Sequence, residues 1–416
     1  MEILVKNKEK RFLPVMLGTD ANAYGMAKSF HKAYGITSLS LGVQNLMETA
    51  HSKIVKVDAE PGFDQDERFV EKMVEVGKTY GAYYEKLLLI ACGDHYTELI
   101  VNNREALEPY FVFSYISKEM KDQLENKEDF YEICEKYGLD YPSTYIVTAE
   151  NYAQEHQLPF GYPVAVKASD SIEYVALSFE GKKKAYKAEN KEEFETILKM
   201  VYEAGYKGHM IVQDFIPGDD DCMWVLNSYS NSQGQVQAMC LGHCVLEDYT
   251  PAGIGNYNAI VQEAKQDIYD RYKKFLEEIK FVGFSNFDMK YDCRDGKYKV
   301  FEINIRQGRS SYFTTASGCN IAQILVENVI EGKNNEETYF HDNPFLWLHV
   351  PEKLAEQYVG EDVLPQVKEL IDAGKYDFTL KYEKDKGFLR NLRVNRYYNM
   401  AFDKYKKYFK KRGLND

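Results

Sequence analysis

The sequence predicts an α/β layer followed by an α+β body, because the pattern of strands and helices changes near residue 123. Before that point apolar strands alternate with helices, which is typical of a parallel sheet covered on both faces. After it, short strands follow one another through brief links, which indicates antiparallel pairing. The chain has 416 residues, 44% of them hydrophobic, which is enough for two to four domains with ordinary cores.

The first layer reads as a Rossmann-like domain over residues 1–123. Its first turn, Gly18 to Gly25, lacks the closely spaced glycines of the dinucleotide fingerprint, so the sequence does not predict NAD binding. The expected elements are the strand 12–18, the helix 19–35, the strand 37–42, the helix 66–84 and the strand 86–94.

After residue 123 the chain continues as the α+β body, and from about Asn335 onward a further segment of helix and strand follows. Helices are expected where apolar residues recur at helical spacing, and strands where they alternate. The expected elements are a helix and a strand in 126–147, a strand in 162–169, a helix in 190–205, two strands in 209–229, a helix in 265–280, and mixed helix and strand after 335.

Charge is unevenly distributed along the chain. The net charge is −13, yet residues 381–416 carry +8 and the other 380 residues carry −21. The basic end favours an acidic partner or peripheral association with an anionic lipid surface, with a solvated amphipathic helix as the alternative. The acidity of the whole chain argues against nucleic acid as the main ligand.

Seven scattered cysteines in a large chain predict reduced thiols and a cytoplasmic protein. The sequence contains no apolar window of about 18 residues, so it predicts no transmembrane segment. The start shows no secretory signal. Cys240, His243 and Cys244 come nearest to a metal-binding spacing, but no second cysteine pair lies nearby, so we interpret them as strand residues.

One hairpin places charged and amide residues where an apolar strand ends. A short apolar run leads into Glu302, Asn304 and Arg306, which alternation puts on one face. With Asp288 on the preceding strand, two acids and an amide would offer hard oxygen ligands, which suit magnesium rather than zinc. Magnesium held by so few protein groups takes its other ligands from phosphate and water, so a nucleotide is expected.

Whether Asp288 meets Glu302 depends on the turn between the strands. A two-residue loop, Asp295–Gly296, would pair residue 288 with 303 and place the acids on opposite faces. A three-residue loop beginning at Arg294, with Gly296 in the left-handed region, would pair 288 with 302. We favour the three-residue loop, because opposed residues have Cβ atoms about 5 Å apart and both acids could then bind one Mg²⁺ at roughly 2.1 Å.

Other segments could bind the nucleotide and the acid substrate. Lys167 lies on the opposite face of its strand from Val164 and Val166, and the alternative is a surface lysine. The extended segment 213–218 could offer backbone groups to adenine, and the acids 219–221 could accept from ribose or form a solvated turn. The ends of the parallel strands, where such sheets bind ligands, carry the candidates Asp20, Asn22 and His95, the last of which could equally be a hydrogen-bonded structural residue.

Residues 302–311, Glu-Ile-Asn-Ile-Arg-Gln-Gly-Arg-Ser-Ser, resemble the Glu-x-Asn-x-Arg-x-x-Arg-Ser-Ser signature of ATP-grasp carboxylate–amine ligases like carbamoyl-phosphate synthetase. The resemblance runs from about residue 13 to 331. It implies an ATP-grasp fold with 1–123 as the N-terminal pre-ATP-grasp domain, 124–210 as the small lobe, 211–334 as the large lobe with the metal site, and 335–416 as a basic C-terminal extension.

The resemblance also implies ATP and two Mg²⁺ as cofactors and assigns roles to residues. Asp288, Glu302 and Asn304 would bind metal, and Arg306 would face an acyl phosphate. The remaining roles are ATP phosphate binding by Lys127 and the catalytic Lys167, adenosine binding by Gln213, Asp214, Phe215, Ile216 and Asp220, and acid-substrate binding by Arg309 and Ser310.

The sequence departs from the family pattern at two places. The segment 168–174, which would close over the phosphates as a lid, lacks the usual glycines. Asn286 stands where ligases of the D-alanine–D-alanine type carry an arginine.

Within the superfamily, residues 13–42 together with 302–313 resemble D-aspartate ligases of Gram-positive cell-wall synthesis. The resemblance implies that the D-aspartate β-carboxylate is activated by ATP and joined to the lysine side chain of a UDP-MurNAc-pentapeptide peptidoglycan precursor. The basic C-terminus could steer such an anionic precursor. The alternatives are another ATP-grasp amino-acid or peptide ligase, and a nucleotide-binding sensor without turnover.

Overall fold

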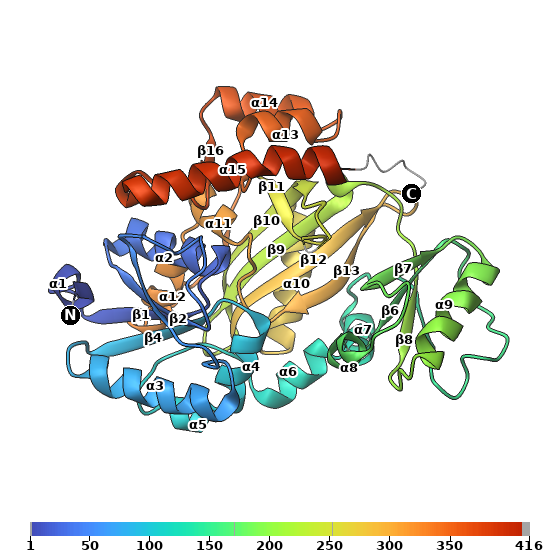
Figure 1. Ribbon diagram of the computed structural model, residues 1–416, viewed down its shortest axis with the longest axis horizontal. Helices are drawn as coiled ribbons and strands as arrows, with labels where there is room; N and C mark the ends of the chain where they lie inside the picture. Colours follow the sequence, from blue (N-terminus) through green and yellow to red (C-terminus); the bar gives the residue numbers. More distant parts are fainter. Residues whose placement is uncertain (1, 170, 252, 410–416) are drawn as a thin grey trace. The chain divides into compact units, whose positions relative to one another are not determined.

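The computed structural model describes residues 2–169, 171–251 and 253–409, which form two compact units (Figure 1). Unit 1 holds the described residues of 1–121, 219–288 and 303–413, and unit 2 those of 122–218 and 289–302. The first passage between the units therefore lies close to the predicted boundary at 123. The N-terminal domain and the C-terminal extension share unit 1.

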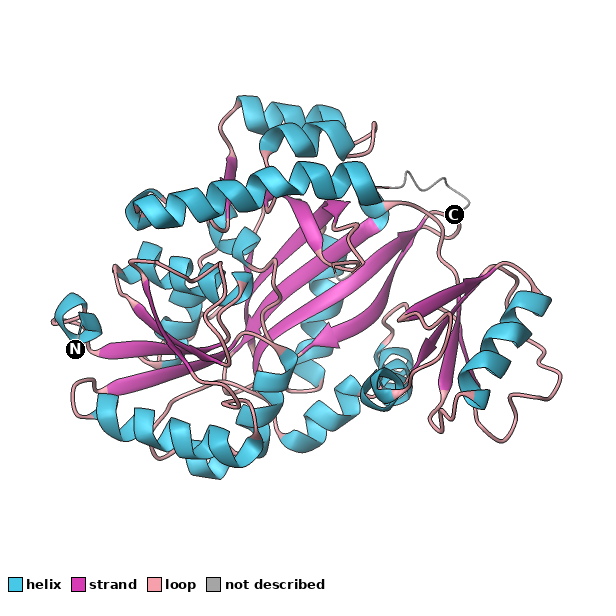
Figure 2. Ribbon diagram, in the orientation of Figure 1, coloured by secondary structure: helices cyan, strands magenta, loops and turns pink. Residues whose placement is uncertain are grey.

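The N-terminal layer is the parallel sheet that the sequence predicts, with strand order β3-β2-β1-β4. Alternate residues of β1 face opposite sides: Met16 packs with residues of α2, and Val15 packs with residues of α3. Helices therefore cover both faces (Figure 2). The elements are α1 (Glu2–Lys6), β1 (Phe12–Leu17), α2 (Ala21–Tyr34), β2 (Ser38–Gly42), β3 (Val55–Ala59), α3 (Asp66–Gly81), β4 (Lys86–Ala91), α4 (Asp94–Asn102) and α5 (Arg104–Leu107).

Both ends of α2 follow local sequence signals. Asp20 caps the helix, since its Oδ1 accepts the N–H of Ala23 at 3.1 Å. Gly35 ends it with φ of 60°, in the left-handed region where glycine carries no steric penalty. The capping puts Asp20 directly after β1, at the carboxyl edge of the sheet.

Unit 2 contains a four-stranded antiparallel sheet in the order β5-β8-β6-β7. Val164 and Val166 of β6 are buried in its core, and Lys167 alternates to the other face, as predicted. The elements are α6 (Lys118–Glu125), which leads into the unit, α7 (Lys127–Tyr137), β5 (Thr144–Val147), β6 (Val164–Ala168), α8 (Ser171–Ala176), β7 (Ala185–Ala188), α9 (Lys191–Glu203) and β8 (Met210–Asp214).

The segment 168–174 differs from the loop that the sequence predicts. Residues Ser171–Ala176 form the short helix α8, while Asp170 lies outside the described residues. With neither glycine nor proline, the segment lacks the residues that most disfavour a helix.

A third sheet has eight strands in the order β13-β12-β9-β10-β11-β15-β16, with β14 beside β10; most of its strands belong to unit 1, and residues 289–302 of β12 and β13 belong to unit 2. Cys240, His243 and Cys244 all lie in β10, so their interpretation as strand residues is confirmed. The elements are η1 (Asp220–Cys222), β9 (Met223–Ser230), β10 (Val236–Glu247), β11 (Tyr257–Gln262), α10 (Gln266–Glu278), β12 (Gly283–Asp292), β13 (Lys297–Asn304), α11 (Tyr312–Ser317), α12 (Ile321–Val329), β14 (Tyr339–Phe340), β15 (Leu346–Leu348) and β16 (Tyr376–Phe378).

The turn between β12 and β13 is longer than predicted. Residues 293–296 connect the strands, and the N–H of Gly296 donates to the carbonyl of Asp292 at 2.8 Å. Gly296 has φ of 73°, so the expectation of a left-handed glycine is correct although the loop has four residues rather than three.

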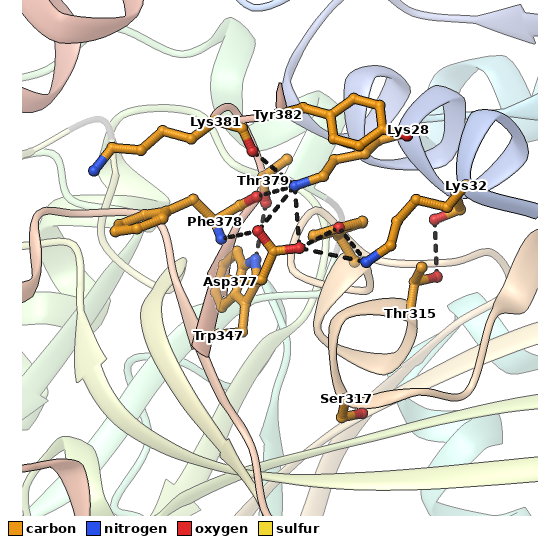
Figure 3. Close-up of polar contacts among 12 residues, drawn as sticks. Lys28, Lys32, Thr315, Ser317, Trp347, Asp377, Phe378, Thr379, Lys381 and Tyr382 are labelled. Atoms are coloured by element: carbon orange, nitrogen blue, oxygen red, sulfur yellow. Dashed lines mark hydrogen bonds and ion pairs between the residues drawn. The ribbon is translucent and has the colours of Figure 1, made fainter. Parts of the chain in front are cut away.

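The C-terminal segment is anchored to α2 by a buried ion pair (Figure 3). Lys28 Nζ donates to Oδ1 of Asp377 at 3.0 Å and to the carbonyls of Phe378 and Lys381 at 2.6 and 2.8 Å. The hydroxyl of Tyr312 donates to the same carboxylate at 2.7 Å. Burial lowers the pKa of Lys28 to about 8, and Asp377 opposes that shift.

A second anchor joins the last helix to the N-terminal layer. Arg390 Nε lies 2.8 Å from Oδ2 of Asp385, which also accepts the hydroxyl of Tyr24 at 2.7 Å. Arg390 Nη1 donates to the carbonyl of Glu48 at 3.0 Å. The elements of this segment are α13 (Glu352–Tyr358), α14 (Leu364–Asp372), η2 (Glu383–Asp385) and α15 (Phe388–Tyr408).

Candidate active site

The segment 306–309 lies against the carboxyl ends of β1 and β4, where parallel sheets bind ligands. Gln307 is buried, and its Nε2 donates to the carbonyl of Ala91 at 2.8 Å. Its own carbonyl accepts Nδ2 of Asn22 at 3.1 Å. Asn22, a predicted substrate ligand, thus holds this segment in place through a buried side chain.

Arg306 is held by a two-point ion pair with Asp94. Its Nε and Nη2 donate to Oδ1 and Oδ2 of Asp94 at 2.6 and 2.7 Å, and Nη1 donates to the carbonyl of Gln307 at 3.0 Å. Burial alone would lower the pKa of Arg306, but Asp94, Asp20 and Asp288 raise it. The guanidinium is therefore a fixed positive charge with its plane set by a carboxylate.

Asp20 and Arg309 share the surroundings of Arg306. Burial raises the pKa of Asp20, while the N–H of Ala23 and the charges of Arg309 and Arg306 lower it. Arg309 Nη1 donates to the carbonyl of Tyr257 at 3.2 Å. The structure therefore brings together one acid and two guanidiniums, which is a set of charges suited to an amino acid.

Two of the predicted metal ligands are in contact in unit 1. Asn304 Nδ2 donates to Oδ2 of Asp288 at 3.1 Å, and the hydroxyl of Tyr257 donates to Oδ1 at 2.9 Å. Burial, then the charge of Asp288, raises the pKa of Tyr257, so the phenol stays a proton donor. The third predicted ligand, Glu302, is an exposed residue of unit 2.

The donor set fits magnesium. Asn304 also donates from Nδ2 to Oδ1 of Asn286 at 3.1 Å, so its nitrogen faces acceptors and its amide oxygen points elsewhere. A carboxylate with an amide oxygen suits a hard cation. Among the described residues no group of three or more His, Cys, Asp or Glu could hold a metal, so a site here needs an amide ligand.

A chain of amides links the metal end to the motif segment. Asn286 Nδ2 donates to Oδ1 of Asn227 at 2.9 Å, and the hydroxyl of Ser311 donates to the same oxygen at 2.7 Å. Ser310, a predicted substrate ligand, is buried beside Ser311. Asn286, where the sequence departs from one branch of the family, thus connects Asn304 to the segment that carries both arginines.

Lys167 belongs to a group of cations in unit 2. Burial, together with the charges of Lys127 and Lys184, lowers the pKa of Lys167 to about 7, and Glu302 opposes the shift. The Nζ of Lys167 lies 5.8 Å from the centre of the Phe301 ring. The predicted phosphate ligands Lys127 and Lys167 are therefore close enough to repel each other, which favours an anionic ligand between them.

The segment predicted to bind adenosine uses its first side chains internally. Gln213 is buried and donates from Nε2 to a threonine hydroxyl of β5 at 2.9 Å. Asp214 forms a two-point ion pair with Arg294 at 3.0 and 2.5 Å. Phe215 is half-buried and Ile216 is buried. The backbone is thus the part of this segment that suits an adenine edge, as the sequence analysis proposed for Asp214 to Ile216.

Two predicted ligands face other partners. Asp220 is buried, and its Oδ2 accepts the N–H of Glu247 and the hydroxyl of Tyr249, both at 2.8 Å. His95 Nε2 lies 2.9 Å from the carbonyl of Asp64, with the side chain 55% exposed. The contact of His95 favours its structural alternative, whereas the burial of Asp220 excludes the solvated turn that was its alternative.

Asp94 and Tyr257 are site residues for which the sequence predicted no individual role. Asp94 belongs to the loop expected at the end of a parallel strand, where a carboxylate is a signal for one. Tyr257 lies within β11, and nothing in its local pattern separates it from a core tyrosine.

Solved structures with a similar fold are ATP-grasp enzymes. An ADP complex of N⁵-carboxyaminoimidazole ribonucleotide synthetase has a TM-score of 0.58 and 13% identity, and the match covers 94% of this chain and 97% of that one. The biotin carboxylase domain of Hydrogenobacter thermophilus 2-oxoglutarate carboxylase, with MgADP, ADP and bicarbonate, has a TM-score of 0.59 and 16% identity over 80% and 72% of the two chains. The fold is therefore ATP-grasp, a class that binds ATP with Mg²⁺.

Sequence comparison narrows the class. The D-aspartate ligase of Enterococcus faecium (strain Aus0004) is 47% identical over 414 residues, which cover 97% of this chain and 98% of that protein. The chain belongs to the D-aspartate ligase family and is an ATP-dependent ligase. No protein-family model matches it.

Proposed function

We propose that this chain activates the β-carboxylate of D-aspartate with ATP and joins it to the lysine side chain of a UDP-MurNAc-pentapeptide, releasing ADP and phosphate. The observation that carries the proposal is the grouping of Asp20, Arg306 and Arg309 beside the Asp288–Asn304 pair. The ammonium of an amino acid could pair with Asp20, and its two carboxylates could pair with Arg306 and Arg309.

The first half of the site would hold ATP. Lys127 and Lys167 bind the phosphates and the backbone of 214–216 binds adenine, while Gln213 fixes the start of that segment through its hydrogen bond to Thr144. Asp288, Glu302 and Asn304 would hold two Mg²⁺, which when bound neutralise charge on the triphosphate.

Transfer then proceeds in two steps. A carboxylate oxygen of the acid attacks the γ-phosphorus, the bond to the bridging oxygen breaks, and ADP leaves an acyl phosphate behind. The amine nitrogen attacks the carbonyl carbon, phosphate leaves with the electrons of the C–O bond, and the nitrogen gives up a proton. Arg306, held by Asp94, stabilises the oxyanion that forms in this second step.

The basic C-terminus supports binding of an anionic, nucleotide-linked acceptor or peripheral contact with an anionic surface. Lys406 and Lys407 are exposed at the end of α15, while Lys410 and Lys411 lie outside the described residues.

Within the described residues, the helices are too short or too polar to cross a membrane. No disulfide joins any of the seven cysteines, which supports a cytoplasmic setting.

Replacing Lys406 and Lys407 by Gln should raise the KM for the acceptor and leave the KM for ATP unchanged.

The reaction is tested with purified enzyme, MgATP, the pentapeptide precursor and a panel of D- and L-amino acids. We expect phosphate release only when D-aspartate and the acceptor are both present, with a product heavier by one aspartyl residue. Release with a different acid would identify another amino-acid ligase. Nucleotide binding without release under any combination would identify a sensor and overturn the proposal.

A further inference from the structure

The side of α15 that carries Tyr397 and Lys404 lies close to Arg309. The two residues are seven positions apart, which is about two helical turns, so they share one side of the helix. The hydroxyl of Tyr397 lies 2.9 Å from Nε2 of the buried His349. Nζ of Lys404 lies 5.7 Å from the centre of the Tyr397 ring.

Arg309 and Lys404 act on the same pair of side chains. Burial raises the pKa of Tyr397, while the charge of Arg309 and a hydrogen bond with it lower this pKa. Burial lowers the pKa of His349 well below its usual range, and Arg309 and Lys404 lower it further. The imidazole is therefore neutral. The cations beside Tyr397 are one guanidinium and one ammonium, and the carboxylates of Glu48 and Asp248 also act on its pKa.

Two acids lie near these cations. Burial raises the pKa of Glu48, with Asp20 adding to the shift and Arg309 and Lys404 opposing it. The Glu48 backbone is fixed from α15, because its carbonyl accepts Nη1 of Arg390 at 3.0 Å. The last helix therefore contributes one cation to this cluster and positions one of its acids.

We propose that α15 completes the acid-substrate site, with Arg309 and Lys404 binding the carboxylate that does not react and Glu48, together with Asp20, binding the ammonium. Tyr397 is a positioning residue that orients Arg309. The inference rests on the proposed function and deepens it. Aspartate carries two carboxylates and one ammonium, and with Arg306 assigned to the reacting carboxylate each of these groups has its own partner.

The proposal predicts opposite responses to two fragments of aspartate. Succinate keeps both carboxylates and lacks the ammonium, whereas β-alanine keeps the ammonium and the reacting carboxylate. Inhibition constants against D-aspartate are measured by phosphate release in the intact enzyme. Lys404→Met should raise the constant for succinate about tenfold, the scale of a charge-assisted hydrogen bond, and change that for β-alanine less than about twofold.

Glu48→Gln should raise the inhibition constant for β-alanine about tenfold and change that for succinate less than about twofold. Tyr397→Phe should act like Lys404→Met, with an increase of about fivefold in the constant for succinate. Arg396→Met, on the exposed face of α15, is the matched control and should change neither constant. Equal changes for both fragments, or none, would mean that these residues only support the fold and would overturn the proposal. If the unmodified enzyme did not turn over D-aspartate, that result would instead refute the proposed function.

Discussion

Lys167 should take up a proton when ATP binds at a pH above about 7. Its pKa in the free enzyme is lowered to about 7 by burial and by Lys127, so about one tenth of the side chain is protonated at pH 8. A neighbouring triphosphate favours the charged form and should raise the pKa by about 2–3 units. Binding then takes up about 0.8–0.9 proton at pH 8 and about 0.1 proton at pH 6.

The lowered pKa of Lys167 sets the direction in which the affinity for ATP changes with pH. Because the free-state pKa is depressed, ATP meets a charged Lys167 below pH 7 and a neutral one above it. The affinity for ATP should therefore be highest at low pH and fall about fivefold between pH 7 and pH 8. Phosphate groups have their second pKa near 6, so the ligand itself contributes little above pH 7.

Isothermal titration calorimetry in three buffers of different ionisation enthalpy measures this uptake, since the observed heat varies with buffer in proportion to the protons bound. Lys167→Met should abolish the uptake at pH 8, and the surface variant Lys199→Met should keep it. A heat that is the same in all buffers at pH 8 would refute the reasoning. Uptake that persists in Lys167→Met would assign the proton to another group.

Three further substitutions, one of them with a matched control, test the site and its support. Arg306→Ala should lower kcat at saturating substrates at least about 100-fold, because one oxyanion donor is worth about 3 kcal/mol, and near-normal turnover in a steady-state assay would contradict its role. Asp94→Asn should lower kcat about tenfold with little change in the KM for ATP, since the ion pair that orients Arg306 is lost; an unchanged kcat would mean that the main chain alone positions this guanidinium. Lys28→Met should lower the free energy of unfolding by about 3 kcal/mol, since it leaves Asp377 partly uncompensated. Lys32→Met should lower the free energy of unfolding by less than about 1 kcal/mol. Similar urea denaturation midpoints for these two variants would show that the ion pair of Lys28 stabilises the fold no more than that of Lys32.

Most of the fold could be predicted because its elements carry clear periodic signals. The sequence indicated α2 through its capping aspartate and terminal glycine, and β6 through strict alternation around Lys167. It missed β3, in which only Val55 is buried, because a strand with one buried residue lacks an alternating pattern. It also missed α8, since a six-residue helix is too short for its period to be recognised.

The site was predictable at the level of residue types and less so at the level of contacts. The motif identified Arg306, Arg309 and Asn304, and the structure pairs Arg306 with Asp94 and Asn304 with Asp288. The internal roles of Asn22 and Asp220 could not be foreseen, because they depend on hydrogen bonds between residues distant in the sequence. Contacts between distant segments are set by tertiary packing, which a local pattern does not encode.

The buried pair of Lys28 and Asp377 has a consequence for synthesis of the chain. The two residues are 349 positions apart, so at ribosomal speeds of about 5–20 residues per second the lysine precedes its counter-ion by roughly 20–70 seconds. During that interval the carbonyls of Phe378 and Lys381 and the ring of Tyr382, which surround the ammonium, are also missing, so this side of α2 stays open to water. The first domain to leave the ribosome should therefore reach its final packing only after the end of the chain has been made.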